Sequence, residues 1–312
     1  MRPLAKVAVV ILASVALYLG LFAFIATKPM SIGFYYRLFE SKATYADSIN
    51  GPKILVMGGS NSFYSVRCEA IEAATNKPCV NLAVTVAFGR NIMLAQLKRL
   101  ARRGDVILMP LEFRLYRDVF DSSWFAIGAP YTFTFDRSIF VQLRPETQLH
   151  YAFSFDMRYL LASIVENVQW WSGARARENF SFQTRQGDRK GHPRSVRTVL
   201  PKQESMAGGA RELDLDGRLA QDYIAFFQWA GRAGVTVIGT FPASIDEIPI
   251  SDAAVARLKD LYAKGGQRFE TLRNRSQYPR DCFFDTAEHL VEECQVEHSR
   301  SLAREFGLAA AL

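Results

Sequence analysis

Short apolar runs in this chain alternate with amphipathic stretches, which is the pattern of an α/β protein. The apolar or β-branched runs at 53–58, 79–84 and 105–113 predict strands, and the stretches 62–76 and 90–103 between them carry apolar residues at helical spacing. Short turns join these elements. Strands and helices that alternate in this way predict a parallel sheet with right-handed crossovers.

The alternation stops at about residue 114 and resumes near residue 217. After that point we predict a helix at 217–232, a strand at 235–241, and helices at 251–273 and 290–306, with Phe283 to Asp285 as a short strand or its end. Residues 114–216 therefore form a long insertion after the third strand. Within it, an aromatic-rich stretch at 151–171 predicts a helix.

The second part of the insertion is strongly basic. Between Gln183 and Gln203 there are six Lys or Arg residues and one Asp. A solvated loop is the ordinary explanation of such a charge run. A lid or an acceptor-binding subdomain is the alternative, because an insertion at the carboxyl edge of a strand lies where binding loops are placed.

The N-terminus carries a candidate membrane span. Residues Val7 to Ala26 are twenty consecutive residues without charge, which is long enough to cross a bilayer. The run is longer than the apolar core of a signal peptide and ends without a small-residue cleavage site, so we expect an uncleaved anchor. Arg2 and Lys6 precede the span and favour a cytoplasmic N-terminus, although Lys28 follows it.

This topology gives three parts: an anchor at 1–28, a juxtamembrane segment at 29–52 and a domain at 53–312 that contains the insertion. We expect a single-pass protein of a bacterial inner (cytoplasmic) membrane, with the domain facing the periplasm or the exterior. The aromatic stretch Phe34 to Phe39 either lies at the membrane interface or packs under the domain.

The four cysteines are compatible with an oxidising compartment. Cys68 and Cys79 are eleven residues apart, and Cys282 and Cys294 are twelve apart. Two local disulfides need the least rearrangement of the chain, and four free thiols are the alternative. None of the spacings is C-x-x-C, so we expect no zinc; we predict no other metal and no cofactor.

The formal charge of +7 would also be compatible with nucleic acid binding. The excess is not concentrated on a nucleic-acid motif, and an exported domain seldom meets DNA, so we expect no nucleic acid partner. A basic surface beside a membrane more simply indicates attraction to anionic headgroups or to an acidic polysaccharide.

The stretch KILVMGGSNS, residues 53–62, is the first candidate for chemistry. It predicts a buried strand followed by a glycine turn and a helix, so that Ser60 lies at a strand-to-helix elbow. There its hydroxyl would project from the carboxyl edge of the sheet, near the first amides of the helix. An ordinary turn that contains a serine is the alternative.

A base for this serine is found near the C-terminus. Asp285 and His289 lie in one predicted loop, and a serine nucleophile needs a histidine base whose ring a carboxylate orients. His298, by contrast, falls inside the last predicted helix, where we expect it to be exposed.

The residues Gly58-Gly59-Ser60-Asn61-Ser62 and the block DTAEHL, residues 285–290, resemble the SGNH (GDSL-like) hydrolase superfamily. The resemblance is to its membrane-anchored extracytoplasmic branch, which includes DltD-like proteins and polysaccharide O-acetylation factors. It implies a flavodoxin-like three-layer α/β/α fold and a catalytic triad of Ser60, His289 and Asp285.

Two positions depart from the pattern of that superfamily. Gly59 stands where many members have Asp, and Glu112 lies in the third block, where the enzymes have an oxyanion-hole Asn. An ionised Glu112 cannot donate a hydrogen bond. The resemblance then implies an oxyanion hole made by the amides of Ser60 and Gly89, with Asn91 as a further side-chain donor.

The resemblance implies acyl transfer through a seryl ester, and water or a sugar hydroxyl can accept the acyl group. We predict an acyltransferase or esterase for acetyl or other acyl groups of an exported or cell-envelope polysaccharide, partnered by a multi-span membrane acyltransferase. The alternative is a non-catalytic accessory protein of such an assembly. A Cys282–Cys294 bridge would fix the loop that holds Asp285 and His289.

Overall fold

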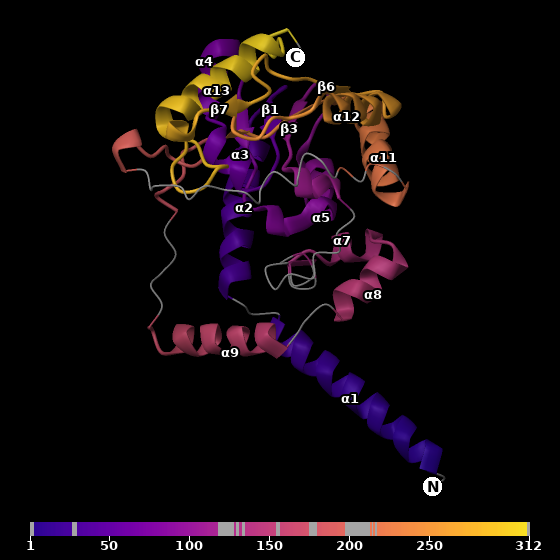
Figure 1. Ribbon diagram of the computed structural model, residues 1–312. Helices are drawn as coiled ribbons and strands as arrows, with labels where there is room; N and C mark the ends of the chain where they lie inside the picture. The colour runs from indigo at the N-terminus through magenta and orange to yellow at the C-terminus, as the bar shows by residue number, and fades with distance from the viewer. Residues whose placement is uncertain are drawn as a thin grey trace. The chain divides into compact units, whose positions relative to one another are not determined.

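The structure is a computed structural model, shown in Figure 1. It describes residues 3–26, 30–117, 128, 131–132, 135–153, 157–174, 180–196, 213, 215 and 217–310. Two compact units are formed: the first by Met1–Arg37, Ala87–Ile92 and Asp121–Glu178, and the second by Leu38–Val86, Met93–Phe120 and Asn179–Leu312. Within the predicted insertion at 114–216, most of residues 197–216 lie outside the described residues.

The second unit is built on a five-stranded parallel sheet, which confirms the predicted α/β class. Its strands, in spatial order, are β2 (Cys79–Asn81), β1 (Ile54–Val56), β3 (Val106–Pro110), β4 (Thr236–Thr240) and β6 (Arg268–Phe269). A separate parallel pair joins β5 (Ser244–Ile245) to β7 (Gln277–Tyr278). If the strands of the main sheet alone are numbered along the chain, so that β6 is the fifth, their spatial order is 2-1-3-4-5. This is an order of doubly wound sheets, in which ligands bind beyond the carboxyl ends of the strands at the switch point. Here that point lies between β1 and β3.

Helices cover both faces of this sheet (Figure 1). The helices α4 (Cys68–Thr75) and α13 (Glu292–Glu305) contact each other on one side, and α11 (Gly217–Ala233) and α12 (Asp252–Lys264) contact each other on the other side. Alternate residues of β1 and β3, such as Ile54, Val56, Val106 and Leu108, pack in one apolar core with Leu302 of α13. The strands β1 and β3 are buried and apolar on both faces because both faces of the sheet are covered.

Two predicted helices have different ends in the structure. The stretch 62–76 forms two helices, α3 (Ser60–Ser65) and α4, because Val66 and Arg67 are extended between them. The stretch 251–273 is helical only to Lys264. Gly266 then turns with a φ of +75°, and the chain enters β6, which the helical prediction missed.

The structure also describes further helices and turns. They are α2 (Met30–Ser48), α5 (Gly89–Leu100), α7 (Arg137–Gln142), α8 (Pro145–Phe153) and α9 (Met157–Trp171), with short 3-10 turns at Val86–Phe88, Phe113–Tyr116, Arg194–Val196 and Arg280–Cys282. In α2, the ring of Tyr36 stacks on Phe135 at 4.2 Å, and Phe39 is 1 % exposed. Tyr36 and Phe39 of this aromatic stretch therefore pack within the protein.

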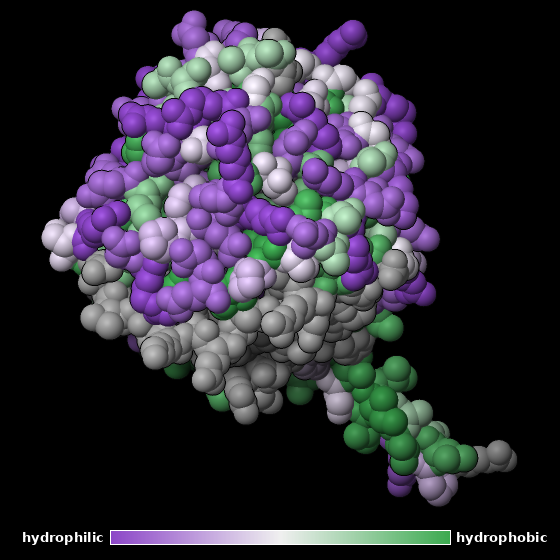
Figure 2. Space-filling view, turned by 45° about the horizontal axis from the view of Figure 1, so that its top comes forward, coloured by the Kyte–Doolittle hydropathy of each residue, from purple (hydrophilic) through white to green (hydrophobic). Residues whose placement is uncertain are grey.

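The N-terminal helix α1 (Pro3–Ala26) is long and apolar enough to cross a membrane. Its best window, Pro3–Leu21, has a mean hydropathy of 2.3, and none of that window is buried. Figure 2 shows apolar side chains of this helix on the surface, and those between Leu4 and Leu21 include many that are exposed. Such a helix serves either as a membrane anchor or as a signal sequence.

Both predicted disulfides are present. Cys68 bonds to Cys79, which joins the start of α4 to β2, and Cys282 bonds to Cys294, which joins the loop before residue 285 to α13. These bonds form and persist in oxidising compartments. They are therefore consistent with a domain outside the cytoplasm.

Candidate active site

The predicted serine elbow forms between β1 and α3. Ser60 is the first residue of α3, and its side chain is partly exposed, whereas Asn61 and Ser62 are buried. The two glycines are needed for space, because a Cβ on Gly58 would lie 2.1 Å from Ser62 Oγ and one on Gly59 would lie 2.4 Å from Glu112 Oε1. A residue with a side chain is therefore resisted at both positions of the predicted glycine turn.

The residues after Ser60 attach the elbow to neighbouring strand ends. Asn61 Nδ2 donates to the carbonyl of Ala243 at 2.7 Å, and the amide of Ala243 donates back to Asn61 Oδ1 at 3.2 Å. Ser62 Oγ donates to the carbonyl of Pro110 at 2.9 Å. Since Pro110 ends β3 and Ala243 follows β4, the elbow lies at the carboxyl edge of the sheet, as predicted.

Glu112 lies directly beneath this elbow. Its carboxylate accepts hydrogen bonds from the amide of Gly59 at 2.9 Å and from the amide of Asn61 at 3.1 Å, so it receives the two amides on either side of Ser60. Burial, together with the negative charge of Glu288, raises the pKa of Glu112 to about 7, although these same amides favour its ionised form. Near neutral pH the side chain is then divided between its neutral and ionised forms.

The predicted base and its carboxylate are in contact. His289 Nδ1 lies 2.7 Å from Asp285 Oδ1, and the histidine side chain is 13 % exposed. Burial works against ionisation of Asp285, but the hydrogen bond and the charge of His289 outweigh it and lower the pKa of Asp285. An ionised carboxylate in this position holds the proton on Nδ1 and leaves Nε2 to act as the base.

This loop is fastened on both sides. Phe283 and Leu290 form an antiparallel bridge across it, the amide of Phe284 donates to the carbonyl of His289 at 2.8 Å, and the Cys282–Cys294 bond closes it. The ends of the loop are thereby held within a few residues of Asp285 and His289. Such support restricts the positions that the His289 ring can adopt.

The loop also lies against α3, which begins with Ser60. The ring of Tyr64 stacks on the ring of His289, with centroids 3.9 Å apart and planes 10° apart. One residue further along the helix, Ser65 Oγ donates to the carbonyl of Glu288 at 3.1 Å. The three predicted triad residues are thus gathered around one short helix, although the sequence separates Ser60 from His289 by more than two hundred positions.

The hydrogen bond between serine and histidine is absent from this structure. Within the described ranges, neither Ser60 Oγ nor His289 Nε2 has a hydrogen-bond partner, and the amide of Ser60 also has none. Catalytic hydrogen bonds are often long without substrate and shorten when it binds. Gly89 and Asn91 belong to the first unit, so their part in an oxyanion hole stays a prediction.

A part of the basic insertion is docked beside the site. The amide of Asn81 donates to the carbonyl of Gln186 at 2.8 Å, and the amide of Arg189 donates to the carbonyl of Phe63 at 2.9 Å. We call residues 180–196 the basic arm. Its backbone is anchored at these two points while Arg185, Lys190 and Arg194 are exposed, so the solvated-loop interpretation and the binding alternative both stay predictions. The arm is held by backbone hydrogen bonds to β2 and α3.

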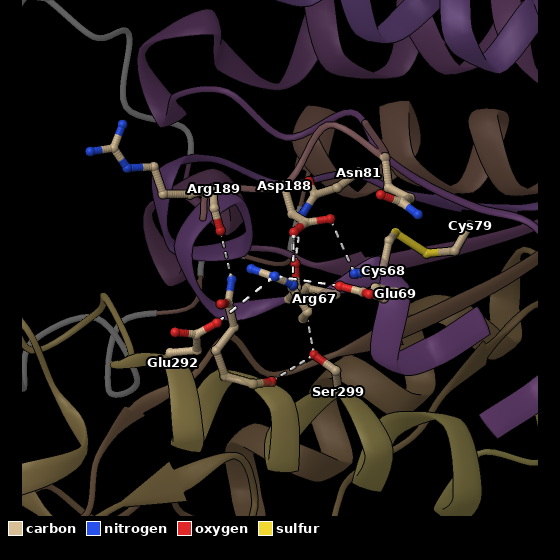
Figure 3. Close-up of polar contacts among 12 residues, drawn as sticks. Arg67, Cys68, Glu69, Cys79, Asn81, Asp188, Arg189, Glu292 and Ser299 are labelled. Carbon is tan, nitrogen blue, oxygen red and sulfur yellow. Dashed lines mark hydrogen bonds and ion pairs between the residues drawn. A yellow bond between two sulfur atoms is a disulfide. The ribbon is translucent and has the colours of Figure 1, made fainter. Parts of the chain in front are cut away.

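An ion pair in the interior supports the arm (Figure 3). Asp188 is fully buried, lies 3.6 Å from Arg67 Nε, and accepts a hydrogen bond from the amide of Cys68 at 3.2 Å. Burial raises the pKa of Asp188 to about 6, and the charge of Arg67 opposes this shift. Gln295 Nε2 adds a hydrogen bond from α13 to the carbonyl of Arg189 at 3.2 Å.

Several residues near the triad were not singled out from the sequence. Tyr64 stacks on the His289 ring. His192 of the basic arm stacks on Phe284, with ring centroids 3.9 Å apart. No spacing in the sequence connects these residues, because the arm and the loop are about ninety positions apart. His298 was expected to be exposed, and this is wrong: it is fully buried and bonded to Tyr278 Oη at 2.9 Å, and burial lowers its pKa to about 3.

No family model, curated protein or solved structure matches this chain. Its function is therefore argued from the geometry of the site.

Proposed function

We propose that this protein is a membrane-anchored serine acyltransferase or esterase, in which Ser60 is the nucleophile, His289 the base and Asp285 the carboxylate that orients the base. The observation that carries the proposal is the stacking of His289, already bonded to Asp285, on Tyr64 of the helix that Ser60 begins. The substrates we propose are acetyl or other acyl esters of an exported or cell-envelope polysaccharide.

The chemistry would proceed in two steps. Ser60 Oγ attacks the acyl carbonyl while His289 Nε2 takes the hydroxyl proton, and the leaving oxygen of the donor receives that proton as the ester bond breaks. A seryl ester results. In the second step His289 deprotonates water or a sugar hydroxyl, whose oxygen takes the acyl group. The proton then passes from His289 to Ser60 Oγ as the seryl ester bond breaks.

The amide of Ser60 is available as a donor to the developing oxyanion, because it makes no hydrogen bond to the described part of the chain. We propose the amide of Gly89 and the side chain of Asn91 as the other donors. Removing one such donor typically lowers the rate by about 10² to 10³.

Membership of the SGNH (GDSL-like) superfamily is part of the same proposal. The strand order 2-1-3-4-5 is the flavodoxin-like order that the resemblance implies, and the nucleophile follows the first strand. Its Asp and His lie before the last helix, α13, as in the terminal block of that superfamily. The insertion at 114–216 would be an addition of this chain.

The cellular setting supports an envelope substrate. The apolar helix α1 and the two disulfides fit a protein anchored in the bacterial inner membrane, with its domain in the periplasm or outside. Acyl donors are made in the cytoplasm, so a transferase in this place needs a supply across the membrane. We propose a multi-span membrane acyltransferase as the partner that provides it.

The test uses the full chain, purified in detergent. We expect a fluorophosphonate to label the protein at Ser60, and a chromogenic acetate to be hydrolysed. Ser60→Ala should abolish both signals, and His289→Gln should lower both by at least about 10³-fold, because single members of a triad act as one unit. A folded wild-type protein with neither labelling nor hydrolysis would overturn the proposal.

A second function is favoured by one specific observation. The carboxylate of Glu112 occupies the amides of Gly59 and Asn61, and an ionised carboxylate beside a forming oxyanion would oppose catalysis. The alternative is a non-catalytic accessory protein of an envelope polysaccharide modification assembly. Unlabelled Ser60, together with retained binding of an acylated glycan by the Ser60→Ala variant, would favour that alternative.

A further inference from the structure

The guanidinium of Arg189 and the candidate base His289 both lie against the ring of Tyr64. The guanidinium carbon lies 5.3 Å from the centroid of the Tyr64 ring and 4.6 Å from that of Phe182. The ring of Tyr64 also stacks on the ring of His289. The cation therefore lies beside the ring that positions the base.

Two other arginines of this region have carboxylate partners. Arg67 lies within 4 Å of Asp188 and of Glu292, and Arg194 Nη1 lies 3.1 Å from Asp281 Oδ2. Arg189 has no carboxylate within ion-pair distance among the described residues, and its Nε is buried without a hydrogen-bond partner. Buried cationic groups are ordinarily paired, so this part of the guanidinium lacks its expected partner among the described residues.

The nearest polar side chain does not supply a negative charge. Arg189 Nη2 lies 3.5 Å from His192 Nε2. Burial, followed by the charge of Arg189, lowers the pKa of His192. The shift favours the neutral form of the histidine, which carries no negative charge to pair with the guanidinium.

The position of Arg189 is built by its backbone. Its amide is bonded to Phe63 and its carbonyl to Gln295, and its neighbour Asp188 is buried against Arg67. Figure 3 shows the side chain of Arg189 pointing away from this network. The backbone of Arg189 is thus fixed, and its guanidinium points away from the network. This lowers the conformational entropy loss that an anion must offset on binding.

We propose that Arg189 binds an oxyanion, the carboxylate or phosphate of an acidic ester substrate, next to the acyl group that Ser60 attacks. The inference rests on the proposed function and names its substrate class. Stacking on aromatic rings leaves the N–H edge of a guanidinium available, and this edge matches the two oxygens of such a group. The aromatic rings fix its plane.

Kinetics with small esters test the recognition of charge. The substrates are 4-acetoxybenzoate, 4-acetoxyphenyl phosphate and neutral phenyl acetate. We expect Arg189→Gln to lower kcat/KM about 10- to 100-fold for the two anionic esters and less than about twofold for phenyl acetate, since a charge-assisted hydrogen bond is lost. A loss confined to one anionic ester identifies whether carboxylate or phosphate is recognised.

The matched control is Arg185→Gln in the same arm. Arg185 also stacks on a tyrosine, with its guanidinium carbon 5.3 Å from the ring of Tyr45, but it is exposed and has no contact with the His289 loop. This variant has the same net charge as Arg189→Gln and should keep wild-type rates on all three esters. Equal losses in the two variants would show a general effect of charge and overturn the proposal.

A binding measurement separates this inference from the proposed function. Calorimetric titration of the full chain in detergent compares trigalacturonate with neutral maltotriose, in wild type and in Arg189→Gln. We expect the wild type alone to prefer the acidic trimer, whether or not Ser60 is reactive. If the wild type prefers the acidic trimer but hydrolyses no ester, only the catalytic proposal is overturned. If both proteins bind the acidic trimer equally and Arg189→Gln leaves the kinetics on the anionic esters unchanged, the Arg189 site is overturned.

Discussion

The carboxylate of Glu112 lies where a side chain on Gly59 would begin. A Cβ added to Gly59 would be 2.4 Å from Glu112 Oε1, and it would also lie 2.6 Å from the backbone nitrogen of Val86. Glu112 reaches this place from the end of β3 and binds the amides on both sides of Ser60. The two departures from the SGNH pattern, a glycine at 59 and a glutamate at 112, are therefore one structural feature.

A double-mutant cycle measures this relationship. We expect Gly59→Ala to destabilise the protein by about 1–3 kcal/mol through overpacking. In the Glu112→Ala background the same change should cost at least about 0.5 kcal/mol less, because one of the two clashes is gone while the contact with Val86 remains. Urea unfolding of the four proteins gives the coupling. Additive effects of the two substitutions would contradict it.

Glu112 should also make stability depend on pH. Burial raises its pKa from the ordinary value of about 4.5 to about 7 in the folded state, so the folded protein binds more protons than the unfolded one between these values. Stability then falls as the pH rises from about 4.5 to 7, by up to about 3 kcal/mol. Below about pH 4.5 Glu112 makes its full contribution to stability, and above about pH 7 that contribution is lost.

The Glu112→Gln variant isolates that contribution. Asp188, whose pKa burial raises to about 6, is present in both proteins, and its effect cancels in the comparison. Unfolding midpoints measured at pH 5 and pH 7.5 should fall less in the variant than in the wild type. An identical decline in the two proteins would show that Glu112 titrates at an ordinary pKa.

Much of the sheet could be predicted because its strands are continuous apolar runs. The runs at β1, β3 and β4 and the stretch at α11 lie within a few residues of their predicted positions. The helix at 251–273 was predicted too long because β6 has two residues, too few to establish a pattern. The break at Val66 depends on distant groups: the amide of Arg67 donates to Ser299 Oγ at 2.7 Å.

The same distinction applies to the candidate site. Asp285 and His289 could be predicted to pair because they share one loop. The stacking of Tyr64 on His289 joins segments that tertiary packing brings together, and no local pattern encodes it. Lys42 is a similar case in α2, where it is fully buried and donates to the carbonyl of Ala83, and burial lowers its pKa well below the ordinary range.

The Cys282–Cys294 bond should support the catalytic loop. Replacing both cysteines by Ser is expected to cost about 3 kcal/mol of stability, as for other loops of this length. It should also slow fluorophosphonate labelling of Ser60, because the bridge closes the segment that holds Asp285 and His289.

The other disulfide is a matched control. Cys68 and Cys79 close a loop of nearly the same length, eleven residues against twelve, at the start of α4. Their replacement should cost similar stability and leave the labelling rate of the folded protein close to that of the wild type. Equal slowing in both double variants would remove the special role of the loop bond.

The buried ion pair between Arg67 and Asp188 should hold the basic arm in place. Asp188→Asn leaves Arg67 with only the exposed carboxylates of Glu292 and Glu69 among the described residues, so we expect about 3 kcal/mol of destabilisation. Trypsin should then cleave faster within 180–196 than in the wild type. Cleavage rates are compared with those of Asp260→Asn, which removes an exposed pair with Lys264 and should change neither quantity. Unchanged proteolysis of Asp188→Asn would show that backbone hydrogen bonds alone hold the arm.

Tyr64 should act as a positioning residue for His289. Its ring stacks on the histidine, so Tyr64→Phe keeps the contact and should label with fluorophosphonate at a rate within about twofold of the wild type. Tyr64→Ala removes the ring, frees His289 to move, and should slow labelling of Ser60 by at least about tenfold, since misplacement by 1 Å can cost 10²-fold. The pH at which labelling is half-maximal is measured in all three proteins. Slower labelling with a shifted midpoint in the Ala variant alone supports positioning of the base. Equal slowing in the Phe variant would assign the effect to the hydroxyl group, and a rate unchanged in the Ala variant would contradict the role of Tyr64.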